Sequence, residues 1–407
     1  MLDGVGTGGY PSLRSCKALR REGGRMSLGY VVGAGKTRFG PTSRSMVQLA
    51  QEAILGALDD ARLGPDDLDA FVVGNFLGGP NDGQLHLNAV VAGLLPGLNL
   101  PSWRVEAACA SGGVALHQAL LALHRYPRIL VLGIERMSGV VGTALTRNIG
   151  MAGDAILDQA VGLNFPASYA LVAQRHIEAH STRLTDFEAV SLKNHANARR
   201  NPKAHFYHKA VSQADIDAGA TVAAPLRLYD CCPVSDGAAA VILSAERLEA
   251  RSVPVLASAV SSDVISLSQR ACHTSFAAAK DAARRAYAQA GLTPADIDFA
   301  EVHDCFTIAE LVAMEDLGFC EPGESGPLVR EGVTARDGRL PINASGGLKA
   351  GGHAIGATGI GQVYETVMQL RGEAGDRQLE RASVGLTHNV GGVGGTCSVH
   401  ILGGERP

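Results

Sequence analysis

The chain has 407 residues, of which 46% are hydrophobic and 19% are charged, and its formal net charge at pH 7 is −4. This composition excludes a disordered chain and a coiled coil, and the slightly acidic balance argues against a nucleic-acid partner. Glycine is abundant, at 50 residues, but lacks the period of three that a collagen helix requires. We therefore expect the glycines to serve close packing or binding loops.

The first 25 residues differ from the rest of the chain. Residues 1–25 carry several basic side chains without an apolar stretch, which is not the pattern of a secretory signal. We interpret them as a disordered leader. In the rest of the chain, no segment is both long enough and apolar enough to predict a membrane span. The cysteines have no regular spacing, which indicates a cytoplasmic protein rather than a disulfide framework.

From residue 28 onward, predicted strands and helices alternate, as is typical of a layered α/β fold. Strands are expected at 28–33, 68–73, 105–108, 128–133, 236–244, 253–260, 297–302 and 383–386, and helices at 43–63 and 113–124. Residues 140–230 have a different texture, with helical patterns at 168–180 and 185–199. We interpret this stretch as an insertion.

The second half of the chain repeats the first. Residues 57–73 and 286–302 share seven identities at a constant offset of 229. The segment Ala-Ser-Gly-Gly recurs at 110–113 and 344–347, in the same order. Two such repeats predict two homologous α/β halves whose matching loops converge on one cleft.

Cys109 is the first candidate for chemistry. It lies between an expected strand and an expected helix, where the helix dipole favours a thiolate. The alternative is a buried structural cysteine. Further along, His303 and Cys305 follow an expected strand, at the end where α/β folds place their sites. The alternative there is an ordinary loop.

Two glycine-rich segments complete the candidate site. One surrounds His353, and the other contains His388 and Gly391 after the strand expected at 383–386. Such loops can direct backbone N–H groups at an anion, although tight turns would also explain them. A thiol, a histidine base and an N–H cradle are together the components of acyl transfer through a thioester. Phosphate-loop, dinucleotide-binding and zinc motifs are lacking, so no cofactor and no metal are expected.

These motifs resemble the thiolase family. The resemblance is carried by residues 106–113, the His353 loop and the last glycine-rich loop, and extends over residues 28–402. The segment His-Asp-Cys-Phe at 303–306 is similar to the sterol-carrier-protein type, where ordinary thiolases have Asn-Glu-Ala-Phe. Segments 193–195, 201–204, 228–230 and 236–240 add to the likeness.

The resemblance implies the thiolase fold: two βαβαβαββ halves in a five-layer α/β/α/β/α sandwich with an inserted loop domain. The halves would span 26–252 and 253–407, with the loop domain at about 140–230. The family implies an acyltransferase that forms or cleaves 3-ketoacyl-CoA in lipid metabolism. Acyl-CoA and CoA would be its substrates, and it would form a homodimer or homotetramer.

The resemblance also implies roles. Cys109 would carry the acyl group, and His353 would take its proton and help to hold the enolate oxygen. His303 would stand in for the family's Asn in that oxyanion hole. A second hole would use the Cys109 N–H and a backbone N–H at Gly391.

Ordinary thiolases have an acid/base cysteine in the last loop. Here His388 and Asn389 are the residues that align with it. In the sterol-carrier-protein type, the cysteine of His-Asp-Cys-Phe is thought to take over that proton transfer, which makes Cys305 the candidate.

Two alternatives remain. One is a thiolase-fold aldolase or C-acyltransferase that works with an OB-fold partner. The other is a non-catalytic acyl-CoA-binding subunit, against which the intact Cys109, Cys305 and His353 argue.

Overall fold

The computed structural model describes residues 21–22 and 25–403. Most of the leader expected at 1–25 lies outside this range. From its end, Arg21–Glu22 (β1) pairs antiparallel with Arg25–Met26 (β2). No helix of the described part has the length and hydrophobicity needed to cross a bilayer.

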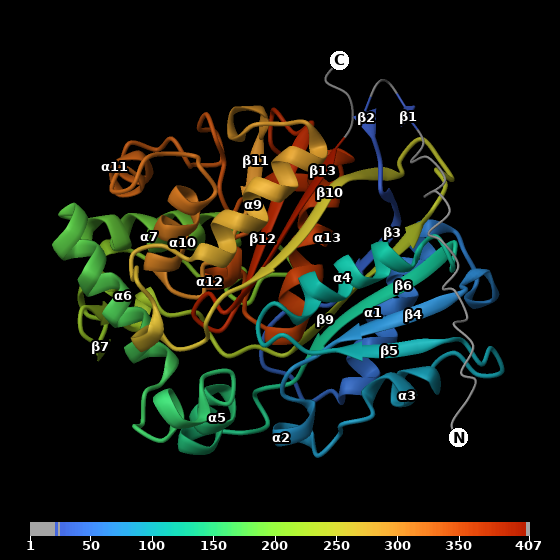
Figure 1. The fold of residues 1–407 in the computed structure, drawn as a ribbon, viewed down its shortest axis with the longest axis horizontal. Helices are drawn as coiled ribbons and strands as arrows, with labels where there is room; N and C mark the ends of the chain where they lie inside the picture. Colours follow the sequence, from blue (N-terminus) through green and yellow to red (C-terminus); the bar gives the residue numbers. More distant parts are fainter. Residues whose placement is uncertain (1–20, 23–24, 404–407) are drawn as a thin grey trace, which may run out of the picture.

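A mixed sheet of nine strands crosses the molecule (Figure 1). Its spatial order is β11-β12-β13-β10-β3-β9-β6-β4-β5. The bounds are β3 Gly29–Lys36, β4 Ala70–Gly74, β5 Ser102–Val105, β6 Arg128–Glu135, β9 Gly237–Ser244, β10 Val253–Ser262, β11 Phe299–Glu301, β12 Val384–Gly391 and β13 Thr396–Gly403. The first residues of β10 pair with β3 and so join the sheets of the two halves, a link that the repeat did not predict.

The two halves have the same strand order. From their junction outward, the first half runs β3, β9, β6, β4, β5 and the second runs β10, β13, β12, β11, so that the first four positions correspond. The repeat at offset 229 covers the end of α1 (Met46–Ala61) with β4, and the end of α9 (Ala277–Ala290) with β11. The internal repeat is therefore seen in the structure.

Helices form the remaining layers. Helices α4 (Ser111–Ala122) and α13 (Thr358–Leu370) pack against each other and against strands of both halves. Helix α1 covers β3, β9 and β6, and α9 covers β10 and β13. The predicted five-layer α/β/α/β/α arrangement is confirmed, with α4 and α13 as its central layer.

The glycines at the start of the two central helices serve close packing. A Cβ on Gly112 would lie 3.0 Å from the Gly356 carbonyl oxygen, and one on Gly359 would lie 2.2 Å from the Gly113 nitrogen. Gly33 lies inside β3, where a Cβ would meet the backbone of α1 at 2.2 Å. Much of the glycine excess therefore reflects backbone contact between layers.

Replacing Gly359 with alanine should destabilise the protein. The new methyl group would meet the backbone of α4, which cannot move independently of the sheets, and such overpacking costs about 1–3 kcal/mol. Gly56→Ala in α1 is the matched control, because its Cβ would have only an ordinary 3.5 Å contact. Thermal unfolding should give a lower Tm for G359A and an equal or higher Tm for G56A; equal Tm values would contradict the packing role.

The inserted stretch lies between β6 and β9 and is largely helical. Its elements are α5 Gly142–Gly150, α6 Phe165–His180, α7 Leu184–Ala198, α8 Gln213–Asp217, β7 Thr221–Ala223 and β8 Leu226–Arg227. The helices outside this stretch that have not yet been named are α2 Gly78–Asp82, α3 Leu87–Ala92, α10 Thr307–Asp316, α11 Ser325–Arg330 and α12 Gly347–Gly351. Although it belongs to the first half in sequence, α7 packs against α10, α11 and α12 of the second half (Figure 1).

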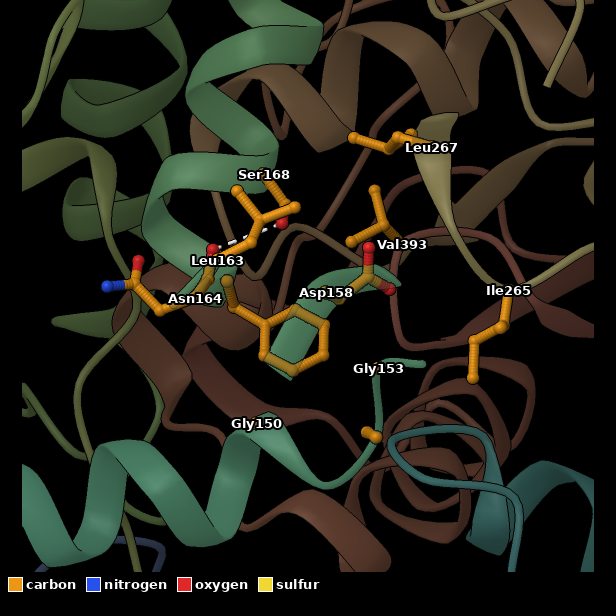
Figure 2. Close-up of a pocket in the computed structure, with 11 residues that line it drawn as sticks. Gly150, Gly153, Asp158, Leu163, Asn164, Ser168, Ile265, Leu267 and Val393 are labelled. Carbon is orange, nitrogen blue, oxygen red and sulfur yellow. Dashed lines mark hydrogen bonds between the residues drawn. The ribbon is translucent and has the colours of Figure 1, made fainter. Parts of the chain in front are cut away.

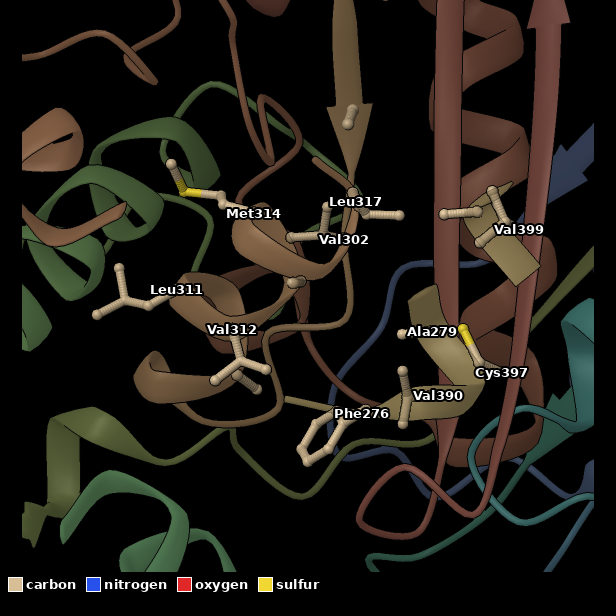
Figure 3. Close-up of a cluster of buried hydrophobic side chains, with 14 of the residues drawn as sticks. Phe276, Ala279, Val302, Leu311, Val312, Met314, Leu317, Val390, Cys397 and Val399 are labelled. Carbon is tan, nitrogen blue, oxygen red and sulfur yellow. The ribbon is translucent and has the colours of Figure 1, made fainter. Parts of the chain in front are cut away.

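The core of the second half brings α9, α10, β12 and β13 together (Figure 3). Phe276, Val312 and Val390 lie in this cluster. Cys397 is fully buried in it beside Val399 and Ala279, as expected for a structural cysteine.

Three predicted elements have other bounds in the structure. The strand expected at 105–108 is β5, which ends at Val105, and the helix expected at 113–124 is α4, which begins at Ser111. Strand β12 continues through His388 to Gly391, because all eight of its residues pair with β13. The turn follows only at Gly392 and Gly394, which have positive φ. His388 is therefore a strand residue and not a loop residue.

Candidate active site

The loop between β5 and α4 holds Cys109 in a fixed position. The Ser111 hydroxyl accepts a hydrogen bond from the Ala107 N–H at 2.9 Å and donates one to the Ala108 carbonyl at 2.6 Å. Ala108 has a φ of 50°, which is uncommon for a residue other than glycine and marks a strained turn next to the thiol. Cys109 itself is buried, with 8% exposure.

Loops from both halves bring three side chains together. The Cys109 sulfur, a ring nitrogen of His303 and a ring nitrogen of His353 all lie within 4.8 Å of one another. The two imidazole rings are 5.2 Å apart and nearly perpendicular. Loops from the two halves therefore converge on one buried cluster, as the repeat predicts.

The Cys109 thiol is protonated in this environment. Burial raises its pKa to about 12, although a backbone N–H of Gly392 directed at the sulfur opposes that shift. Phe76, Met137 and Leu145 belong to the apolar cluster around it. The prediction that the helix dipole favours a thiolate is wrong, because desolvation outweighs it. The thiol must therefore pass its proton to a neighbouring base when it reacts.

His353 is a neutral base with a defined tautomer. The Thr358 hydroxyl donates to the Ala354 carbonyl at 3.0 Å, so its oxygen accepts from Nδ1–H of His353 at 2.8 Å. The proton is thus on Nδ1, and Nε2 has a free lone pair. Burial lowers the pKa of His353 to about 3, which keeps the ring neutral at ordinary pH.

The last glycine-rich loop approaches the thiol through its backbone. The Gly392 N–H, not that of Gly391, is directed at the Cys109 sulfur. Gly391 has a different function: a Cβ there would lie 2.4 Å from the Ala107 carbonyl oxygen. Its lack of a side chain lets the last loop approach the nucleophile loop.

Cys305 lies beside Tyr169. The tyrosine hydroxyl contacts the Cys305 sulfur and donates to the Gly392 carbonyl at 3.1 Å, and its ring stacks on Phe306 at 4.7 Å. Burial raises the pKa of the Cys305 thiol, so it too is protonated. Sequence reasoning missed Tyr169, because a single aromatic residue in a helix gives no signal that it reaches a loop more than 200 residues away.

His388 does not reach Cys109 directly. Its Nδ1 accepts the backbone N–H of His303 at 3.4 Å, and its Nε2 is buried without a hydrogen-bond partner among the described residues. Burial lowers its pKa to about 3. The neighbouring Asn389 is the residue whose side chain bonds the ring of His303. Of the two residues that align with the family's last-loop cysteine, Asn389 is therefore the one whose side chain contacts the His303 ring.

Within the described part of the chain, one other group brings three potential metal ligands within 4.8 Å: His176, His180 and Glu315. His176 is already hydrogen-bonded at both ring nitrogens, to Thr182 at 2.6 Å and to Glu315 at 3.1 Å. This network joins α6 to α10.

A small pocket lies next to the thiol's apolar surroundings (Figure 2). Gly150, Asp158 and Leu163 line it from the inserted stretch, and Ile265 and Val393 line it from the second half. Its lining residues Ala152 and Phe165 also pack in the cluster around Cys109.

A buried thiol with a neutral imidazole base and inward-facing donors defines a site for thioester chemistry. Family comparison agrees: residues 29–247 match the model "Thiolase, N-terminal domain", and residues 259–404 match "Thiolase C-terminal domain-like". The chain belongs to the thiolase family.

Relatives and solved structures extend this assignment. The chain is 46% identical to acetyl-CoA acetyltransferase of Methanothermobacter thermautotrophicus, over 91% of this chain and 98% of that protein. It is 35% identical to human sterol carrier protein 2, over 91% of this chain and 71% of that one. Among solved structures, the Ltp2–ChsH2(DUF35) aldolase has a TM-score of 0.81 at 27% identity, covering 93% of this chain and 98% of that one.

Proposed function

We propose that the protein is a thiolase of the acetyl-CoA C-acyltransferase type, which forms or cleaves 3-ketoacyl-CoA through an acyl group carried on Cys109. The observation that supports this most is the placement of His303 and His353 within 4.8 Å of a buried thiol. The 46% identity to an acetyl-CoA acetyltransferase favours this activity over the alternative of an aldolase or C-acyltransferase that works with an OB-fold partner. The non-catalytic alternative has no support from a site whose chemical groups are all present.

In the cleavage direction, the first step begins with the thiols of Cys109 and Cys305 both protonated. Cys109 passes its proton to Nε2 of His353, and its sulfur attacks the 3-keto carbonyl carbon. The bond between C2 and C3 breaks, and the acetyl-CoA enolate carbon takes the proton of Cys305. This leaves acyl-Cys109, a Cys305 thiolate and protonated His353.

The second step restores the resting state. CoA enters, its thiol proton passes to Cys305, and its sulfur attacks the acyl-Cys109 carbonyl. Cys109 leaves and takes its proton back from His353, so protons and thiols balance over the cycle. Synthesis is the reverse sequence. The Tyr169 hydroxyl, which contacts Cys305, would turn from the Gly392 carbonyl to donate to the thiolate that forms between the steps.

Two sets of donors stabilise the negative oxygens in this scheme. Nε2–H of His303 serves the enolate, together with His353 once that ring is protonated. The N–H groups of Gly392 and Cys109 serve the tetrahedral intermediate. The acyl-CoA would approach beside the small pocket in Figure 2, between the inserted stretch and the last loop.

The direct test is acylation by acetyl-CoA. Purified protein incubated with acetyl-CoA should carry one acetyl group on Cys109, located by peptide mass spectrometry, and free CoA should remove it. A protein that takes up no acetyl group while its Cys109 thiol remains accessible to alkylation would overturn the proposal.

Cys305→Ser should separate the two half-reactions. Acetylation of Cys109 uses Cys305 only to return a proton to the departing CoA thiolate, which can also take a proton from water, so it should remain within about threefold of wild type. Cleavage and condensation need the proton at carbon and should fall by about 10²–10⁴ because the acid/base is lost. Cys397→Ala removes a buried thiol outside the site and is the control. Unchanged condensation in C305S would show that Cys305 is not the acid/base.

We further propose a homodimer or homotetramer that works in the cytoplasm in lipid metabolism. The seven cysteines of the described part are all unpaired, which fits a reducing compartment. A further proposal is an OB-fold partner protein. Its one support is that the similar aldolase structure is named with a DUF35 component. Light scattering of the purified protein tests the oligomer, and co-purification from its own cells tests the partner.

A further inference from the structure

The chemistry of His303 depends on which ring nitrogen carries its proton. Nδ1 lies 3.2 Å from the Nδ2 amide nitrogen of Asn389. An amide nitrogen only donates hydrogen bonds, so Nδ1 must accept, and the proton of the neutral ring is on Nε2.

The orientation of the Asn389 amide is fixed from the other side. Its Oδ1 accepts the backbone N–H of Gly113 at 3.3 Å. This N–H belongs to the first turn of α4, where it has no partner within the helix. A flipped amide would place two donors against each other at Gly113 and leave Nδ1 of His303 facing an oxygen. One orientation therefore satisfies both contacts.

The space for this amide is also specific. A Cβ on Gly359 would lie 2.5 Å from the Asn389 oxygen, and one on Gly113 would lie 3.1 Å from it. The side chain thus sits between the first turns of α4 and α13, where the two halves meet.

The remaining proton of His303 has no partner. Nε2 is buried and makes no hydrogen bond within the described part of the chain, although the ring lies in the cluster with Cys109 and His353. Such an unpaired buried donor is costly in the resting protein and gains a partner only when a negative oxygen forms beside it.

We propose that Asn389 is a positioning residue that fixes His303 in the Nε2–H tautomer, so that His303 presents a donor to the enolate oxygen. The chain of bonds runs from the Gly113 N–H through the Asn389 amide to His303. This inference rests on the proposed thiolase function for the identity of the oxygen, but the tautomer itself follows from the hydrogen bonds alone.

Asn389→Asp is the sharpest variant. A carboxylate keeps the bond from Gly113 but cannot donate to His303, so the neutral ring must move its proton to Nδ1 and lose the Nε2–H donor. Cleavage and condensation should fall by about 10²-fold near pH 8, as for the loss of one oxyanion donor. Acetylation of Cys109, which uses the other donors, should remain within about threefold of wild type.

The pH profile distinguishes positioning from a structural role. The titratable groups that face His303 are His353, His388 and Cys109, all of which are uncharged in the resting site. The new carboxylate therefore dominates and raises the pKa of His303. Below that pKa the ring carries protons on both nitrogens and Nε2–H returns. The condensation rate of N389D should rise as the pH falls from 8 to 5.5, whereas that of wild type should not.

Ser398→Ala is the matched control. Ser398 pairs with Asn389 across the sheet and is equally buried, but its hydroxyl has no hydrogen-bond partner within the described residues. Condensation by S398A should equal that of wild type. N389D that condenses like wild type at every pH would overturn the inference. So would N389D that loses acetylation and condensation together without recovery at low pH.

A measurement on the unchanged protein covers the case in which N389D does not fold. Nitrogen-15 NMR of histidine-labelled wild type, assigned with His303→Gln, should show the proton of His303 on Nε2, and a proton on Nδ1 would overturn the inference. Failure of wild type to acetylate Cys109 would instead count against the proposed function and leave the tautomer result unaffected.

Discussion

Replacing Cys109 with alanine is expected to abolish both the acetyl adduct and the acyltransferase activity. No other described thiol lies within 4.8 Å of two imidazole nitrogens, so no neighbour can take over the covalent step. Loss of the nucleophile should lower kcat at least about 10³-fold. The remaining hydrogen-bond donors can polarise the substrate carbonyl, but no thiol is left to attack it. The measurement is steady-state cleavage of acetoacetyl-CoA together with the intact mass after incubation with acetyl-CoA.

The exposed Cys272 provides the control for this result. Cys272→Ala removes an exposed thiol outside the cluster of Cys109, His303 and His353. It should leave both the acetyl adduct and the acyltransferase activity unchanged. In wild type, the buried Cys109, whose pKa is raised to about 12, should react with iodoacetamide more slowly than Cys272. An acetyl adduct that persists in C109A would place the acyl carrier elsewhere.

Local sequence patterns predicted the layers well, because helix and strand periodicities are set by the residues of each element. The repeat at offset 229 related the pair α1 and β4 in the first half to the pair α9 and β11 in the second. The five-layer arrangement came from the resemblance to thiolases. The end of β12 could not be predicted in this way. Its last residues, His388 to Gly391, are extended because they pair with β13, and glycine carries no preference that would reveal such pairing.

The members of the site could be predicted, but not their protonation. Cys109, His303, Cys305 and His353 all lie in or beside one cluster, as the motifs indicated. The thiol's pKa depends on Phe76, Met137 and Leu145, which come from separate segments and gather only in the fold. The same holds for Asn389, whose partners Gly113 and His303 belong to different halves. Long-range burial and hydrogen bonding are what the sequence patterns lack.

Removal of the base at position 353 has the second large expected effect. His353→Asn should slow acetylation of Cys109 by about 10²–10⁴-fold, because a thiol whose pKa is about 12 needs a neighbouring acceptor for its proton. Thr358→Val keeps the base but removes the oxygen that holds the Nδ1 proton, and should slow acetylation by only about tenfold. Stopped-flow measurement of CoA release in a single turnover compares the three proteins.

The pH dependence of this step follows from the environment of His353. The neutral ring is the active form, and protonation would remove the lone pair that accepts the thiol proton. An unperturbed imidazole would lose half of its activity near pH 6.5. Burial lowers the pKa of His353 to about 3, so the base stays neutral as the pH falls, and acetylation should be nearly constant between pH 5.5 and 8. A decline with a midpoint near 6.5 in wild type would contradict the lowered pKa of His353, and acetylation by H353N at the wild-type rate would contradict the assignment of His353 as the base.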